Sequence, residues 1–192
     1  MAGILAVGAL TFAAVRIFDS LEEEEDRAEA PAGFWGPSET CHVDDAVDGR
    51  IRTVPVDSIG DLLEERRGCL VLLEVYASWC PNCRRVFPMV SEMASRYREY
   101  GVRVVALSTD EDLGRLRSFL ATQTVELPVF WVPPSEPGEL TAALEAIGAR
   151  FDQGIPFFAL IDPDGRPLPS VTAASSLMDV NNAIHDFMGG RR

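Results

Sequence analysis

Lysine is absent from this 192-residue chain. All 17 basic residues are arginine, and only two histidines are present, His42 and His185. The chain therefore has no lysine to act as a Schiff-base nucleophile, general base or phosphate-loop cation. Two histidines leave little material for a histidine-based metal site or a catalytic triad, and we expect both at the surface or in packing contacts. These absences exclude several common classes of enzyme.

Positive charge is also scarce. The chain carries 17 basic and 30 acidic residues, a net charge of −13, and its pI is about 4.5. This balance argues against a nucleic-acid partner, which would require a basic face. Residues 1–50 hold 11 acidic and 3 basic residues, whereas residues 51–192 hold 19 and 14. The length and the 47% apolar fraction allow one domain with a sizeable core, and we place it at residues 51–192.

The N-terminus begins with an apolar run. Residues 1–15 carry no charged side chain, and residues 1–18 would span about 27 Å as a helix, close to the thickness of a membrane. We predict that residues 1–18 form an uncleaved signal anchor, with a cleaved signal peptide or a buried core helix as alternatives. An anchor would place the domain on the extracytoplasmic side. Residues 19–50, acidic and interrupted by proline and glycine, are predicted to form a tether.

Beyond residue 50, apolar residues recur alternately at strand and helix spacing. This alternation predicts an α/β layered structure. Strands are expected at residues 69–77, 102–107, 128–132 and 157–161. Helices are expected near residues 56–67 and at 81–97, 110–122, 139–147 and 177–187.

The sequence Trp-Cys-Pro-Asn-Cys at 79–83 lies where a buried strand is predicted to pass into a helix. At a helix N-terminus the first thiol, Cys80, faces unpaired N–H groups that favour the thiolate, which is the attacking species in disulfide exchange. Cys83, one turn later, is placed to resolve a mixed disulfide. The pair is thus predicted to be a redox-active disulfide with no other cofactor. The alternative, half of a zinc knuckle, lacks a second ligand pair, and we predict no metal site.

The segment ASWCPNCRRVFP at 77–88 resembles the active-site segment of thioredoxin-like proteins, and more narrowly the membrane-anchored bacterial TlpA/ResA group. The resemblance covers about residues 52–190. It implies a thioredoxin fold, a central mixed sheet flanked by helices, with the strand and helix in 128–148 as a TlpA-like insertion. Pro88 matches a proline within the active-site helix, and Gly154-Ile155-Pro156 resembles the family's cis-proline loop.

The resemblance also implies roles for single residues. Glu74 lies six residues before Cys80, where the family carries a buried acid. A buried carboxylate with a raised pKa could take the proton of Cys83 during resolution. Family members often place a lysine near this acid, and this chain has none. Trp79, Pro81, Ile155 and Pro156 are expected to contact the substrate. These four residues would surround the dithiol.

Cys41 and Cys69 allow two interpretations. A buried free cysteine is common, so Cys69 alone needs no partner. In an oxidising compartment, however, a disulfide between Cys41 and Cys69 would join the tether to the domain and restrict the unfolded chain. Arg84 lies four residues after Cys80, and we expect it on a solvated helix face rather than beside the thiolate.

The resemblance implies a reductant of client proteins with disulfides, such as apocytochrome c or copper-site proteins during assembly. It would sit at the bacterial inner membrane, face the periplasm and be recharged by a transmembrane thiol electron donor. A disulfide-forming oxidant is the alternative within the same class. A copper-binding chaperone that uses Cys80 and Cys83 as soft ligands is the alternative outside it.

Overall fold

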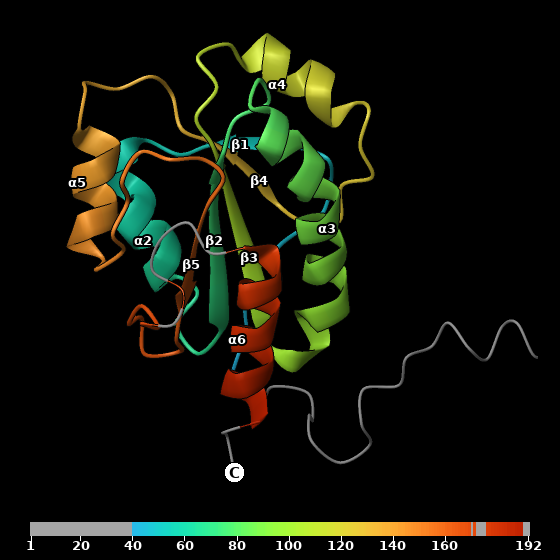
Figure 1. Ribbon diagram of the computed structural model, residues 1–192, viewed down its shortest axis with the longest axis vertical. Helices are drawn as coiled ribbons and strands as arrows, with labels where there is room; N and C mark the ends of the chain where they lie inside the picture. The colour runs from blue at the N-terminus through green and yellow to red at the C-terminus, as the bar shows by residue number, and fades with distance from the viewer. Residues whose placement is uncertain (1–39, 170, 172–175, 190–192) are drawn as a thin grey trace, which may run out of the picture. The chain divides into compact units, whose positions relative to one another are not determined.

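The computed structural model describes residues 40–169, 171 and 176–189, and Figure 1 shows one sheet with helices on both faces. The strands are β1 (Ile51–Thr53), β2 (Leu70–Tyr76), β3 (Val102–Ser108), β4 (Val129–Trp131) and β5 (Phe157–Ile161). The helices are α2 (Ile59–Glu64), α3 (Pro81–Tyr97), α4 (Leu113–Leu120), α5 (Glu139–Ala146) and α6 (Leu177–Gly189). Two 3-10 turns, Val56–Ser58 and Arg98–Tyr100, precede α2 and follow α3.

The five strands lie in the order β1-β4-β3-β2-β5. Strands β1 to β4 pair in parallel with their neighbours, and β5 runs antiparallel to β2. This mixed sheet confirms the predicted α/β thioredoxin-like fold. Strand β4, which we assigned with α5 to the insertion, lies between β1 and β3. The sheet therefore places β2, which leads into the cysteine motif, between β3 and β5.

Strand β2 forms the centre of the core because all seven of its residues are buried. Successive side chains point to opposite faces of a strand. Val71, Leu73 and Val75 belong to a cluster that includes residues of α2 and α5. The other face of β2 carries Glu74, and it is the face toward α3 and α6 (Figure 1). A charged residue thus lies in an otherwise apolar strand.

Two differences from the sequence prediction concern β1 and the start of α4. Strand β1 was not predicted, because three residues, one of them Arg52, give no recognisable apolar run. Helix α4 begins at Leu113 rather than at residue 110, because the Asp112 side chain accepts the N–H of Gly114 at 2.7 Å and caps the helix. Strand β1 depends on long-range pairing with β4 and the start of α4 depends on a local cap, and hydrophobic periodicity records neither.

The predicted anchor (residues 1–18) and the tether as far as residue 39 lie outside the described residues. Residues 40–50, which we call the strap, lie against the domain. Cys41 forms a disulfide with Cys69, and Thr40 donates to the carbonyl oxygen of Gly68 at 2.9 Å. A Cβ at Gly68 would lie 2.3 Å from the carbonyl oxygen of Thr40, so this contact requires glycine.

Within the described ranges, no helix has both the length and the apolar character to cross a membrane.

Candidate active site

The turn from β2 to α3 places Cys80 at the N-cap of the helix and Pro81 at its first position. Proline is favoured there because its missing N–H would have no helical partner. The N–H of Cys80 donates to the carbonyl oxygen of Ala77 at 3.1 Å, which closes the turn. The N–H of Cys83 donates to Sγ of Cys80 at 3.3 Å. The first sulfur therefore receives a hydrogen bond from the first turn of the helix.

The loop before β5 approaches Cys80 from the other side. The Ile155–Pro156 peptide bond is cis. Sγ of Cys80 donates to the carbonyl oxygen of Ile155 at 3.6 Å. The structure thus brings the predicted loop to the predicted cysteine, although the two are 75 residues apart in the sequence.

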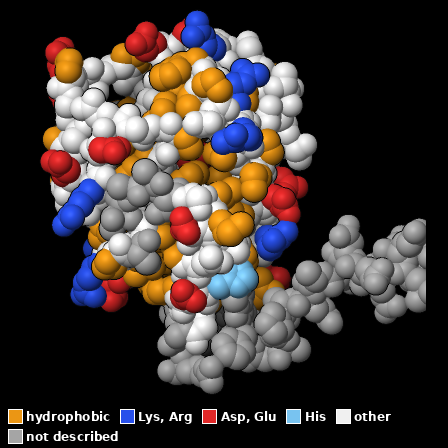
Figure 2. Space-filling view, in the orientation of Figure 1, with side chains coloured by type: hydrophobic (Ala, Val, Ile, Leu, Met, Phe, Trp, Pro, Cys, Tyr) orange, Lys and Arg blue, Asp and Glu red, His pale blue; other side chains and the backbone are white. Residues whose placement is uncertain are grey.

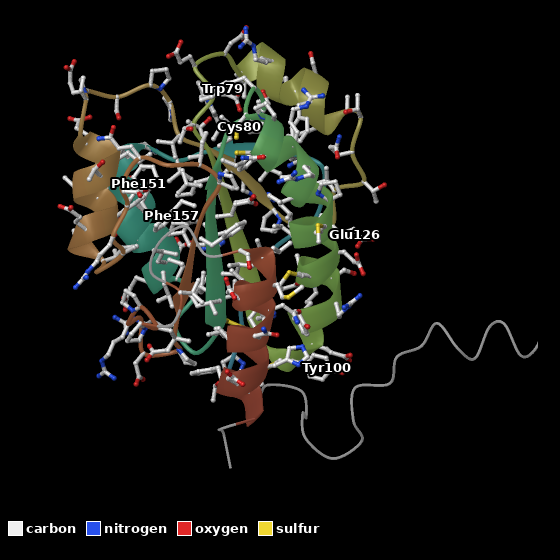
Figure 3. All side chains as sticks on the ribbon, in the orientation of Figure 1. Trp79, Cys80, Tyr100, Glu126, Phe151 and Phe157 are labelled. Carbon is white, nitrogen blue, oxygen red and sulfur yellow. A yellow bond between two sulfur atoms is a disulfide. The ribbon has the colours of Figure 1, made fainter. Side chains whose placement is uncertain are left out.

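Trp79 lies beside Cys80 at the top of the molecule, at the end of α3 (Figure 3). Its side chain is 54% exposed, which is unusual for a tryptophan. Pro81 is also exposed. Figure 2 shows hydrophobic side chains gathered at this end of the visible face. The four residues predicted to contact the substrate therefore lie close to Cys80 in space or in sequence, and part of this surface is open and apolar.

The two cysteines are both free thiols but differ in environment. Cys80 retains 6% of its surface, and Cys83 retains none. Burial raises the pKa of the Cys83 thiol far above its usual value of 9.0, and the hydrogen bond with Cys80 and the charge of Glu74 act in the same direction. Cys80 is therefore the thiol that a second protein can reach first, whereas Cys83 is held in its protonated form.

Glu74 lies on the α3 side of the sheet, paired in register with Ala106 and Phe158. It is fully buried, and neither carboxylate oxygen has a hydrogen-bond partner among the described residues. Burial raises its pKa from 4.5 to about 8. The charged form of Glu74 raises the pKa of Cys83, so the two groups are close enough to interact. A carboxyl group with this pKa can exchange a proton near neutral pH.

Sequence reasoning missed Tyr76, two residues after Glu74 on the same face of β2. Its ring contacts that of Phe87 at a centroid distance of 5.1 Å, and its hydroxyl is buried with no partner among the described residues. Burial, together with the charge of Glu74, raises the pKa of the Tyr76 phenol well above its usual value. Tyr76 was missed because an aromatic residue in a buried strand gives no signal beyond packing.

Sequence reasoning also missed three polar residues at the ends of β2 and β3. Ser78 follows β2, Ser108 ends β3, and Asp110 lies just beyond it. All three are buried, and both serines are hydrogen-bonded to Asp110. One signal was available: the carboxyl ends of adjacent parallel strands meet at one edge of the sheet, so polar residues that follow two such strands lie close together. The sequence alone did not show that β2 and β3 were adjacent.

The remaining candidates lie elsewhere. His42 is exposed in the strap, and His185 on α6 contacts the hydroxyl of Tyr97 at 2.8 Å. Arg84 is exposed, as expected for a helix face, but its guanidinium also binds the carbonyl oxygen of Ser78 at 3.4 Å. Among residues 40–169, 171 and 176–189, no group of three or more histidine, cysteine or acidic side chains is arranged to hold a metal ion.

Comparison with known proteins agrees with this geometry. The thioredoxin-like family matches residues 68–167, more than half of the sequence, so the chain belongs to the thioredoxin-like family. Among curated proteins it is similar to the thiol-disulfide oxidoreductase ResA of Bacillus subtilis (strain 168), with 25% identity over 126 residues, 66% of this chain and 63% of that protein. ResA of Bacillus anthracis is 26% identical over 109 residues, 57% and 58% of the two chains.

Two solved structures are also similar. One is a putative thiol:disulfide interchange protein DsbE from Chlorobium tepidum, with a TM-score of 0.54, 28% identity, and coverage of 66% of this chain and 85% of that one. A thioredoxin domain of a thiol-disulfide oxidoreductase from Bacteroides vulgatus shares the fold, with a TM-score of 0.53, 19% identity, and coverage of 66% and 84%. The chain spans less than two thirds of the length of the two curated relatives above.

Proposed function

We propose that this protein is a thiol–disulfide oxidoreductase that acts on protein disulfides through Cys80 and Cys83. The observation that carries the proposal is the pair of free thiols at the N-terminus of α3, with the N–H of Cys83 directed at the sulfur of Cys80. The similar proteins ResA and DsbE are named as a thiol-disulfide oxidoreductase and a thiol:disulfide interchange protein, which supports the same thiol–disulfide exchange chemistry for this chain.

In the first step, the thiolate of Cys80 attacks one sulfur of a client disulfide. A bond forms between Sγ of Cys80 and that sulfur, while the client S–S bond breaks and the second sulfur leaves as a thiolate. The N–H of Cys83 stabilises the attacking thiolate. The product is a mixed disulfide between the protein and its client.

In the second step, Cys83 must lose its proton before it can attack Sγ of Cys80. Its high pKa makes this loss unfavourable without a base. Glu74, in its carboxylate form, accepts the proton, because its pKa of about 8 lies near working pH. The Cys80–Cys83 bond then forms and the client sulfur leaves. Two electrons have passed from the dithiol to the client disulfide.

The client segment binds in extended form across Cys80, Trp79 and the Ile155–Pro156 loop. The exposed Trp79 ring supplies apolar contact area, and Pro81 borders it. Backbone groups of Ile155 next to the reacting sulfur can pair with the backbone of the client. Contacts to backbone and apolar area accept many sequences, which suits an enzyme with several protein clients.

We further propose that the protein works as a reductant outside the cytoplasm. Residues 1–18 would anchor it in the bacterial inner membrane, and a transmembrane thiol donor would recharge it. Its clients would be disulfide-containing proteins in assembly, such as apocytochrome c or copper-site proteins. The Cys41–Cys69 disulfide supports this location because structural disulfides persist in oxidising compartments.

One experiment separates this proposal from its alternatives. The Cys80–Cys83 couple is titrated against glutathione and followed by peptide mass mapping, alongside reduction of a model disulfide protein and binding of Cu(I). We expect a strongly reducing potential, reductase turnover that is lost in Cys80→Ser, and no tight copper binding. An oxidising potential would indicate a disulfide-forming enzyme. Tight copper binding without turnover would overturn the proposal in favour of a copper chaperone.

A further inference from the structure

The turn at residues 77–80, which carries Cys80, is held from the end of the neighbouring strand by one carboxylate. Asp110 is 1% exposed and its Oδ2 accepts the N–H of Ser78 at 2.8 Å. Its Oδ1 accepts the Ser78 hydroxyl at 2.5 Å. Both side-chain oxygens of Asp110 therefore bind a residue that lies two positions before Cys80.

Asp110 is itself fixed to the sheet. The hydroxyl of Ser108, the last residue of β3, donates to Oδ2 of Asp110 at 2.8 Å, and the N–H of Asp110 donates back to that hydroxyl oxygen at 3.2 Å. The indole N–H of Trp131, at the end of β4, donates to the carbonyl oxygen of Asp110 at 2.7 Å. Asp110 is thus held to the ends of two strands, through its carboxylate at β3 and through its backbone carbonyl at β4.

Helix α3 holds the other side of the turn. The guanidinium of Arg84 donates to the carbonyl oxygen of Ser78 at 3.4 Å and lies over the ring of Phe119 at 5.4 Å. The N–H of Arg84 donates to the carbonyl oxygen of Cys80 at 3.0 Å. All three polar groups of Ser78 therefore have partners.

We infer that Asp110 is a positioning residue for Cys80, an inference that rests on the proposed oxidoreductase function. Sγ of Cys80 must stay near both the N–H of Cys83 and the carbonyl oxygen of Ile155. A displacement of about 1 Å can reduce the rate of an enzyme about 100-fold. Asp110 does not contact the sulfur in this arrangement; it acts through Ser78.

Charge and position predict opposite effects for Asp110→Asn. By charge alone, removing a nearby carboxylate would stabilise the Cys80 thiolate and lower the pH at which Cys80 becomes reactive. By position, asparagine offers one accepting oxygen where aspartate offers two, so only one of the two hydrogen bonds from Ser78 keeps its direction and the hold on the turn weakens. The thiolate then loses its hydrogen bond from Cys83, and reactivity requires a higher pH. The direction of the change therefore identifies the role.

The test compares reduced wild-type protein with Asp110→Asn, Ser78→Ala and Thr109→Ala. The last is a matched control, because the Thr109 hydroxyl binds the carbonyl oxygen of Tyr76 at 3.2 Å rather than Ser78. Alkylation of Cys80 by iodoacetamide is followed against pH by peptide mass mapping, and turnover with a model disulfide protein is measured in parallel. We expect Asp110→Asn to raise the pH midpoint and lower turnover about 10- to 100-fold. Ser78→Ala should change both in the same direction by less, and Thr109→Ala neither.

A lowered midpoint in Asp110→Asn would overturn positioning in favour of a charge effect. Unchanged midpoints in folded Asp110→Asn and Ser78→Ala would overturn it in favour of a purely structural role. If Asp110→Asn does not fold, Ser78→Ala alone decides, since it removes only one hydroxyl. Wild-type protein without turnover would contradict the proposed function, while the alkylation profiles would still test the inference.

Discussion

Asp45 in the strap and Glu74 in β2 are two buried carboxylates with opposite surroundings. Asp45 is 8% exposed, and its carboxylate binds the guanidinium of Arg66, itself 4% exposed. Glu74 is 0% exposed and has no hydrogen-bond partner among the described residues. Burial of an unpaired acid is costly, whereas a paired acid can join two segments. The comparison separates a carboxylate that joins two segments from one whose unpaired burial raises its pKa.

The pair of Asp45 and Arg66 is one of several contacts that hold the strap. Arg66 also donates to the carbonyl oxygen of Leu62 in α2. Arg103 donates to the carbonyl oxygen of Val43 at 2.7 Å, and Arg98 to that of Asp45 at 3.1 Å. The strap is therefore bound by arginine donors that reach both its carboxylates and its backbone oxygens, a use that suits the planar, multidentate guanidinium.

The largest effect is expected from breaking the paired carboxylate. Asp45→Ala removes the buried carboxylate that pairs with the buried guanidinium of Arg66 and should lower the free energy of unfolding by about 3–5 kcal/mol. Urea denaturation measures this loss. The matched control is Asp44→Ala, because Asp44 is exposed and pairs with Arg98 at 3.3 Å. It should change stability by less than about 1 kcal/mol. Equal effects of the two variants would contradict the difference drawn between buried and exposed acids.

A similar but smaller loss is expected from removing the disulfide, another link between strap and domain. Cys41 and Cys69 are 28 residues apart, and closing a loop of that length stabilises a protein by about 3–4 kcal/mol in the chain-entropy model. The double variant Cys41→Ala/Cys69→Ala should lose up to this amount in urea denaturation. Its reductase turnover should stay at the wild-type level, because Cys80 and Cys83 are untouched. Loss of turnover in the folded variant would show that the strap takes part in catalysis.

The smallest change in stability is expected at Glu74 and depends on pH. Its folded-state pKa of about 8 lies above its ordinary value of 4.5, so folding favours the protonated form. The stabilisation that protonated Glu74 contributes is fully present below pH 4.5 and is lost as the pH rises through 8. Between pH 6.5 and 7.5, the free energy of unfolding of the wild-type protein should fall by about 1 kcal/mol more than that of Glu74→Gln.

Glu74→Gln should also resolve mixed disulfides more slowly, since it cannot accept the Cys83 proton. Rapid-quench measurement of the mixed disulfide should show a slowing of about 10-fold or more. Parallel stability curves for the two proteins over this pH range would contradict the buried, unpaired state of Glu74. Wild-type resolution rates in Glu74→Gln would contradict its role as the base.

Most of the sheet and the helix carrying Cys80 could be predicted, because β2 and α3 have long, clear apolar periodicity. The family resemblance added the Ile155–Pro156 loop. Contacts between distant residues could not be read from periodicity. Asp45 meets Arg66 across 21 positions and Ser78 meets Asp110 across 32, and both contacts depend on which elements become neighbours. The lack of partners around Glu74 is likewise a property of the folded surroundings and not of the local sequence.

The Cys41–Cys69 disulfide also determines how mechanical load would travel through the molecule. A pull on the chain before Cys41 would pass through the disulfide to Cys69, immediately before β2. The 28-position loop that contains β1 and α2 would lie outside the load path. The load would enter β2, an interior strand that pairs with β3 on one side and β5 on the other. Under tension, the edge strand β1 would therefore be shielded rather than peeled from the sheet.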